Sequence, residues 1–126
     1  MVFGRIIALA AAGACGTLAR YGLAGLVQRW AGRDWPWGTL AVNALGCLLA
    51  GVFWSVAESR LSISPHWRAV VLIGFMGAFT TFSSLCLETS QLARDAEWLA
   101  AGANLVANNV AGVVCVIVGL ALGRML

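Results

Sequence analysis

The fold is decided by a long apolar stretch near the start of the chain, IIALAAAGACGTLARYGLAGLV, residues 6–27. The stretch holds a single charged side chain, Arg20, and it exceeds the roughly 20 apolar residues that an α-helix needs to cross a bilayer. A cleaved secretory signal has a shorter apolar core of about 7–15 residues. We therefore expect a retained transmembrane helix over about residues 3–27.

Three further apolar stretches follow, and we expect them to form helices over about residues 37–57, 66–92 and 98–122. The chain has 126 residues, of which 61% are hydrophobic and 10% charged, whereas a soluble domain carries about 25% charged residues. Four crossings use most of this length and leave no room for a soluble domain. The sequence therefore predicts an all-α membrane protein, a single transmembrane domain over residues 1–126 with four transmembrane helices. The expected helix ends carry the tryptophans of an interfacial aromatic belt: Trp30, Trp35, Trp37, Trp67 and Trp98.

The composition argues against several classes of function. The four cysteines lie singly inside apolar runs, with no CxxC pair, where cysteine behaves as a small hydrophobic residue. The eight arginines are scattered near the expected helix ends, so there is no solvated basic face for nucleic acid. We find no GxSxG, no phosphate loop and no metal-ligand cluster, and we therefore expect neither a nucleic-acid partner nor an enzyme.

The arginines give almost no preference for one orientation in the membrane. With the N-terminus in the cytoplasm, four arginines face that side and three the other, with Arg20 set aside as intramembrane, so the positive-inside rule does not choose between orientations. Either other factors orient the chain, or copies insert both ways and pair antiparallel. A four-helix chain is too small to enclose a selective path alone, so we expect an oligomer in both cases. The two groups are Arg5, Arg60, Arg68 and Arg124 on one side, and Arg29, Arg33 and Arg94 on the other.

The third expected helix contains an unusual stretch, GFMGAFTTFSS, residues 74–84. Two glycines, two threonines and two serines make a poor helix interior. Irregular backbone at membrane depth is tolerated where protein or a water-filled cavity satisfies its polar groups, and broken helices build ion sites in transporters. Small residues also allow close helix packing. The stretch alone leaves a broken helix and a closely packed one open.

Other polar side chains at membrane depth also have two interpretations. Glu88 lies about one turn beyond Ser84, and an intramembrane acid indicates function unless it is a protonated structural residue. Arg20 either snorkels to the interface or lies in a vestibule. Stripes of polar and small residues either join helices by hydrogen bonds or line a pathway. These stripes are Thr39, Asn43, Cys47 and Gly51, and then Asn104, Asn108 and Gly112.

Three motifs together resemble those of the Fluc (CrcB) fluoride channels. They are GTLARY at residues 16–21, WPWGTL at residues 35–40 with Val42 and Asn43, and GFMGAFTTFS at residues 74–83. The likeness extends over all four expected helices, although the fourth contributes little beyond its small-residue stripe. The resemblance implies a passive, fluoride-selective channel that exports fluoride and relieves its toxicity.

The same resemblance implies the assembly. We expect a multi-pass protein of the bacterial inner membrane, with its third helix broken near the middle. Two copies would form an antiparallel, dual-topology homodimer with two fluoride pathways, which would explain the balanced arginines. The backbone carbonyls of Gly77 and Thr80 would hold a structural sodium ion at the dimer interface.

Residue roles carry over by position. Asn43 would offer its amide N–H groups to fluoride, and Phe82 the positive edge of its ring. Thr39, Ser83, Ser84 and Glu88 would line the polar part of the path, with Arg20 near an aqueous vestibule.

Two positions depart from the family pattern. Leu85 stands where the family usually has a second phenylalanine, so one of two anion–ring contacts is absent. Asn108 stands where the family often has a small hydroxyl residue; its amide could still donate to an anion in the pathway, but its larger side chain would narrow it.

Fluoride is small and tightly hydrated, so a pore must replace its water with donors from which the ion can leave. The main alternative is a small four-helix multidrug-type exporter coupled to protons. Such an exporter would place an essential acid in its first helix, whereas the only membrane-embedded acid here is Glu88. A purely structural role would leave the matched motifs unexplained.

Overall fold

Helices make up most of the chain. The computed structural model describes residues 2–59 and 63–126; Arg60, one of the arginines in the charge count, lies outside these residues. The first two spans are α1 (Val2–Ala31) and α2 (Trp37–Ser59), and the last is α6 (Trp98–Met125). The third span, Pro65–Arg94, is divided into α3 (Pro65–Ala69), the π-helical segment η1 (Val70–Met76), α4 (Gly77–Phe79) and α5 (Phe82–Arg94). All four spans are long and apolar enough to cross a membrane, which confirms the expected all-α, four-span class.

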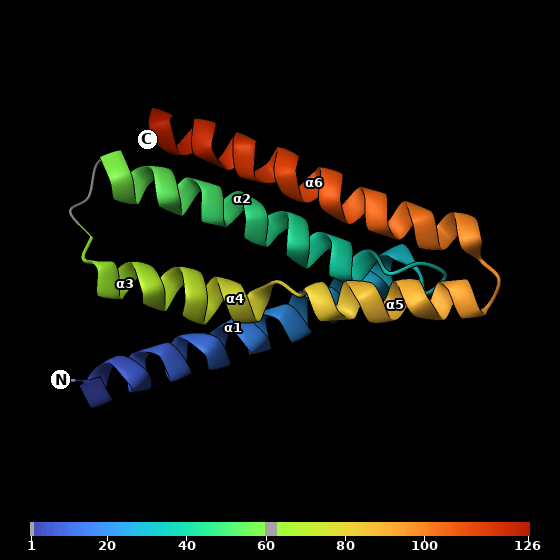
Figure 1. Ribbon diagram of the computed structural model, residues 1–126, viewed down its shortest axis with the longest axis horizontal. Helices are drawn as coiled ribbons and strands as arrows, with labels where there is room; N and C mark the ends of the chain where they lie inside the picture. The colour runs from blue at the N-terminus through green and yellow to red at the C-terminus, as the bar shows by residue number, and fades with distance from the viewer. Residues whose placement is uncertain (1, 60–62) are drawn as a thin grey trace.

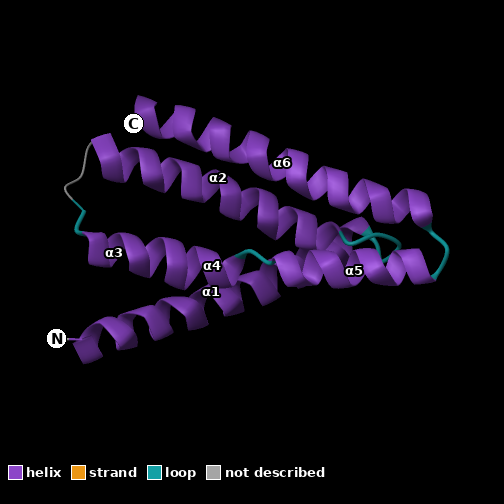
Figure 2. Cartoon of the chain, in the orientation of Figure 1, coloured by secondary structure: helices purple, strands orange, loops and turns teal. Residues whose placement is uncertain are grey.

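The spans form an antiparallel bundle (Figure 1). Both termini lie at one end, while the α1–α2 and α5–α6 connections lie at the other. Figure 2 shows helices joined by short loops throughout the described residues, with one loop interrupting the third span between α4 and α5. This connectivity is what four consecutive crossings require.

The third span changes its packing partner along its length. The most extensive helix pair is α2 with α6, whereas α1 packs on η1 and α4, in the first half of the third span, and on α2. Beyond the interruption, α5 packs on α6 instead. The two halves of the third span are therefore held by different neighbours.

Glycines allow the helix backbones to touch. A Cβ atom on Gly119 would overlap the backbone carbonyl of Leu48, and one on Gly51 would overlap that of Val116. Small residues at such crossings permit the close approach on which helix association in membranes depends. The α2 and α6 backbones therefore pack closely at Gly51 and Gly119.

The α1–α2 connection is tied together by Gln28. Its Nε2 donates to the carbonyls of Gly32 at 2.6 Å and Trp35 at 2.7 Å, while its Oε1 accepts from the N–H of Gly38 at 2.9 Å. Trp35 in turn donates to the carbonyl of Ala100 on α6 at 3.2 Å. Gln28 is part of α1, which continues to Ala31, beyond the expected end near residue 27. These bonds fix the start of α2, and with it the height of Thr39 and Asn43.

The interior is unusually polar for such an apolar chain. Many large apolar side chains face outward, where lipid would contact them. Among the described residues, Val42 and Asn104 are the largest fully buried side chains. Buried polar groups are more informative than exposed apolar ones. They are Thr39, Ser55, Asn104 and Asn108, and all but Ser55 belong to the site described below.

Candidate functional site

The site is built around the interruption of the third span. Helical structure ends at Phe79 and begins again at Phe82, with extended backbone at Thr80 (ψ 159°) and Thr81 (φ −151°, ψ 115°). The N–H and the hydroxyl of Thr80 both donate to the carbonyl of Met76, at 3.0 and 2.9 Å. The Thr81 hydroxyl oxygen accepts from the Ser84 N–H at 3.1 Å, which makes Thr81 the N-cap of α5.

The interruption releases backbone carbonyls from helical pairing, among them those of Gly77 and Thr80. In a continuous α-helix the N–H of residue 81 would donate to the carbonyl of Gly77, and that of residue 84 to the carbonyl of Thr80. Here the Thr81 N–H donates to Asn43 and the Ser84 N–H to the Thr81 hydroxyl. These two oxygens belong to the residues at which the family resemblance implies a cation site.

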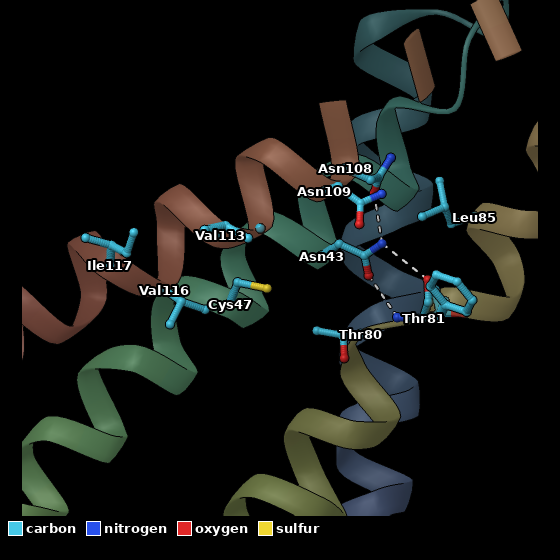
Figure 3. Close-up of a pocket in the computed structure, with 12 residues that line it drawn as sticks. Asn43, Cys47, Thr80, Thr81, Leu85, Asn108, Asn109, Val113, Val116 and Ile117 are labelled. Carbon is cyan, nitrogen blue, oxygen red and sulfur yellow. Dashed lines mark hydrogen bonds between the residues drawn. The ribbon is translucent and has the colours of Figure 1, made fainter. Parts of the chain in front are cut away.

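Asn43, on α2, is paired with the extended backbone. Its Oδ1 accepts from the Thr81 N–H at 2.8 Å, and its Nδ2 donates to the Thr81 carbonyl at 3.2 Å (Figure 3). Both main-chain polar groups of Thr81 are satisfied by one side-chain amide. A buried backbone group without a partner is costly, so Asn43 stabilises the interruption.

The amide of Asn43 also begins a chain of hydrogen bonds into α6. Its Nδ2 donates to Oδ1 of Asn108 at 2.9 Å (Figure 3). The Nδ2 of Asn108 donates to both the backbone oxygen and Oδ1 of Asn104, each at 3.0 Å. The Nδ2 of Asn104 donates to Oγ1 of Thr89 on α5 at 3.0 Å. The polar stripes of α2 and α6 thus meet, and they are joined to α5 by Thr89, which sequence reasoning missed.

An open groove of about 450 Å³ lies beside this chain. The polar wall includes Asn43, Thr81 and Asn108, whereas Cys47, Val116 and Ile117 belong to the apolar wall (Figure 3). Phe82 also borders the groove, with 72% of its surface exposed, whereas Leu85 is only 3% exposed. The two positions at which the family would place rings therefore differ in exposure: one is open and the other is packed inside.

The first turn of α5 adds a cluster of hydroxyl groups. The Thr81 hydroxyl donates to Oγ of Ser84 at 3.0 Å and lies 3.3 Å from Oγ of Ser83. Positions 81, 83 and 84 thus lie together at the N-terminus of α5, where helix N–H groups and the positive end of the helix dipole favour an anion. The structure brings Asn43, Phe82, Ser83, Ser84 and Asn108 into one region.

Thr39 and Glu88 form a second polar region, nearer the end of the bundle that carries the α1–α2 connection. The Thr39 hydroxyl donates to Oε1 of Glu88 at 2.6 Å. Within the described residues, Oε2 of Glu88 is buried without a hydrogen-bond partner. Glu88 also borders a polar cavity of about 470 Å³, whose wall includes Gln28, Arg33, Asp34, Gln91, Asp95 and Glu97.

Arg20 contacts the first half of the third span. Its Nε donates to the carbonyl of Ala78 at 3.0 Å. The last carbonyls of a helix lack intrahelical partners, and here α1 supplies one for α4. Neither snorkelling nor a vestibule predicts this bond, and the vestibule role stays a prediction.

Comparison with known proteins places the chain in a family. Residues 7–120 match the family described as CrcB-like protein, Camphor Resistance (CrcB). A fluoride-specific ion channel FluC of Nitrosococcus oceani is 52% identical over 118 residues, which are 94% of this chain and 94% of that relative. A protein of the same name from Desulforapulum autotrophicum is 48% identical over 122 residues, 97% of this chain and 98% of its own length. Another from Solidesulfovibrio magneticus is 50% identical over 118 residues, 94% of each chain.

These relatives are named as ion channels, which agrees with the prediction that the chain is not an enzyme and does not support the exporter alternative. The membrane spans and the channel family together make this a multi-pass membrane protein. The match covers the three motifs on which the sequence resemblance was based and confirms it: this chain belongs to the CrcB family.

Proposed function

We propose that this chain forms a passive, fluoride-selective channel of the bacterial inner membrane, which exports fluoride and relieves its toxicity. The observation that carries the proposal is the donor-rich region at the start of α5, in a chain 52% identical to a protein named as a fluoride-specific channel. Other observations bear on selectivity, on assembly and on the structural ion.

The donors suit a small, hard anion. Hydroxyl groups at Thr81, Ser83 and Ser84 gather around the N-terminus of α5, and the positive edge of the Phe82 ring can add to them. Among the described residues, no arginine borders the groove beside them. A fixed cation would hold fluoride too firmly, whereas conduction needs sites that release the ion.

A second copy would complete the pathway. One chain leaves the groove open and Phe82 largely exposed, although a selective path must be closed on all sides. An antiparallel homodimer of dual topology would cover this face, and the near balance of the arginines fits insertion in both directions. Glu88 and Thr39 would line the polar stretch of each path, with Arg20 near its vestibule.

A structural sodium ion suits the interruption. Unwound carbonyls and half-helix C-termini bind sodium in transporters, and the carbonyls of Gly77 and Thr80 are both released from helical pairing by the hydrogen bonds at Thr81 and Ser84. Among the described residues, no group of three or more His, Cys, Asp or Glu side chains converges on a metal site. Backbone oxygens are therefore the ligands to test, and one copy offers too few of them, which suits an ion shared by two copies.

The test of function is ion efflux from liposomes that contain the purified protein. Liposomes loaded with potassium fluoride or potassium chloride are diluted into a solution free of both anions, and valinomycin is added to carry potassium. Fast loss of fluoride with retention of chloride is expected. Loss of both ions, or of neither, contradicts the proposal. Fluoride loss that occurs only when a proton gradient is imposed would indicate a proton-coupled exporter.

A further inference from the structure

Backbone groups fix the side-chain amide orientations of Asn43 and Asn108. They are the Thr81 N–H at one end of the hydrogen-bond chain and the backbone oxygen of Asn104 at the other. The Thr81 N–H can only donate, so the Asn43 atom 2.8 Å from it is Oδ1, and Nδ2 faces Asn108. At the other end the backbone oxygen of Asn104 can only accept, so the Asn108 atom 3.0 Å from it is Nδ2. Both ends give the same result: Asn108 presents its oxygen to Asn43.

This arrangement uses the donors of Asn43. The side chain has two N–H groups, and its Nδ2 already reaches the Thr81 carbonyl at 3.2 Å and Oδ1 of Asn108 at 2.9 Å. A fluoride ion at this amide must replace one of these acceptors. The Thr81 carbonyl belongs to the reciprocal pair that holds the extended backbone, whereas Oδ1 of Asn108 belongs to a side chain at the groove. The oxygen of Asn108 is therefore the acceptor that an anion would displace.

Asn104 keeps Asn108 from turning. It is fully buried, accepts both hydrogen bonds from Nδ2 of Asn108, and is itself held by Thr89. Every side-chain bond in the sequence Asn43, Asn108, Asn104, Thr89 donates in the same direction, and bonds in such a chain polarise one another. Rotating the amide of Asn108 would break both bonds to Asn104 and bring N–H groups of Asn108 and Asn43 together.

We propose that Asn108 sets the fluoride affinity of the channel by competing, through Oδ1, for an N–H of Asn43, and that Asn104 is the residue that positions it. The inference rests on the proposed fluoride function. Asn108 then competes with fluoride, as an acceptor, for an N–H of Asn43 and does not donate to the ion, so it lowers the fluoride affinity of the site. A weaker site releases the ion sooner, so this competition raises throughput at high fluoride concentration.

The test compares Asn108→Ser with wild type and with Gly102→Ser. A serine at 108 can donate to the carbonyl of residue 104 on its own helix and is too short to reach Asn43. The half-saturating fluoride concentration of liposome flux is expected to fall about fivefold, the size of one net hydrogen bond, and the maximal flux to fall with it. Gly102 is an exposed residue of the same helix, away from the groove, and a Cβ there meets nothing within 4 Å, so Gly102→Ser should leave both quantities unchanged.

A second variant tests the positioning role. In Asn104→Leu the side-chain acceptor is lost while the backbone oxygen remains, so the half-saturating concentration should shift the same way by about twofold. No shift in a folded Asn108→Ser protein, or a rise, overturns the inference. If wild type carries no fluoride at all, the proposed function fails instead, which keeps the two failures distinguishable.

A measurement on unsubstituted protein covers the case in which the variants do not assemble. Fluoride is added to wild-type protein labelled with ¹⁵N-asparagine, and the side-chain amide resonances are followed by NMR. The Asn43 N–H signals should move as fluoride replaces Oδ1 of Asn108, while those of Asn108 stay bonded to Asn104. A fluoride-dependent shift that indicates a hydrogen bond from the Asn108 N–H to the ion overturns the inference.

Discussion

Leu85 is a buried leucine at a position where the family usually has phenylalanine. It borders the groove with 3% of its surface exposed, so a ring here would be packed and held in place. Leu85→Phe is expected to raise fluoride flux severalfold at equal protein, because a second positive ring edge would face the path. The comparison is flux per protein in liposomes against Leu87→Phe, which changes a side chain that is 61% exposed. Equal flux in Leu85→Phe and wild type would show that the ring is dispensable. Reduced folding of Leu85→Phe would show that the added volume is not accommodated, since overpacking a tight core costs about 1–3 kcal/mol.

Thr39 satisfies one oxygen of an acid that lies at membrane depth. Thr39→Val keeps the shape but leaves Oε1 of Glu88 without its 2.6 Å donor, which should cost about 1–3 kcal/mol of stability. Thermal unfolding in detergent is expected to shift to a lower temperature, and Thr39→Ser should restore it. An unchanged unfolding temperature in Thr39→Val would show that water or another group replaces the hydroxyl.

The sequence identified polar residues at the site better than it identified their partners. Asn43, Glu88 and Asn108 stand out because a polar side chain at membrane depth is costly and needs a reason. The bond from Arg20 to Ala78 joins residues 58 apart in sequence, and Asn104 reaches Thr89 across two different helices. Such pairs depend on the rotation and height of whole helices, which no local pattern contains. Thr89 had no signal of its own, because a lone threonine in a membrane helix usually bonds to its own backbone.

At the scale of elements, the four spans were predictable and their ends less so. Apolar length alone identifies a span, but α1 continues to Ala31 because Gln28 and Arg29 are good helix formers that hydropathy excludes. The extended residues Thr80 and Thr81 lie inside the stretch that the sequence singled out, yet that stretch fitted close packing equally well. Both occur together here: Gly46 packs against Thr80, while Asn43 pairs with the backbone that follows it.

The α2–α6 contact can be tested through its glycines. Gly119→Ala should destabilise the protein by about 1–3 kcal/mol, because the added Cβ would overlap the Leu48 carbonyl, which belongs to a helix backbone. Gly102→Ala is the matched control on the same helix, since a Cβ there meets nothing within 4 Å, and it should be neutral or slightly stabilising. Unfolding in detergent measures both, and equal behaviour of the two variants would contradict the contact.

At the scale of the whole molecule, the proposed dual topology makes the arginine balance a functional property. Adding two arginines beside Arg33 in the α1–α2 connection should orient nearly all copies one way and abolish fluoride flux, because antiparallel pairs could no longer form. Coexpression with a second chain that carries the extra arginines beside Arg124, at the opposite end, should restore flux. Full activity of the first variant alone would exclude an antiparallel assembly.

The proposed sodium ion predicts a dependence of assembly on the cation. Replacing sodium by N-methylglucamine should increase the fraction of monomer in dilute detergent solution, because the carbonyls of Gly77 and Thr80 would face one another across the interface without a cation. Size-exclusion chromatography measures this fraction without reference to transport. The same monomer fraction in both cations would rule out a structural sodium ion.

The reciprocal pair between Asn43 and Thr81 also suggests an order in which the protein assembles during synthesis. Synthesis proceeds from the N-terminus, so α2 enters the membrane before the third span leaves the ribosome. The backbone at Thr81 therefore meets its partner amide as it arrives, and it does not have to wait in lipid with its polar groups unpaired. Asn104 and Asn108 come last, on α6, and complete the chain of amides only after the interruption is already in place. A chain released after residue 94 would thus form a three-span intermediate in which the interruption is stabilised but Asn43 still lacks its second acceptor.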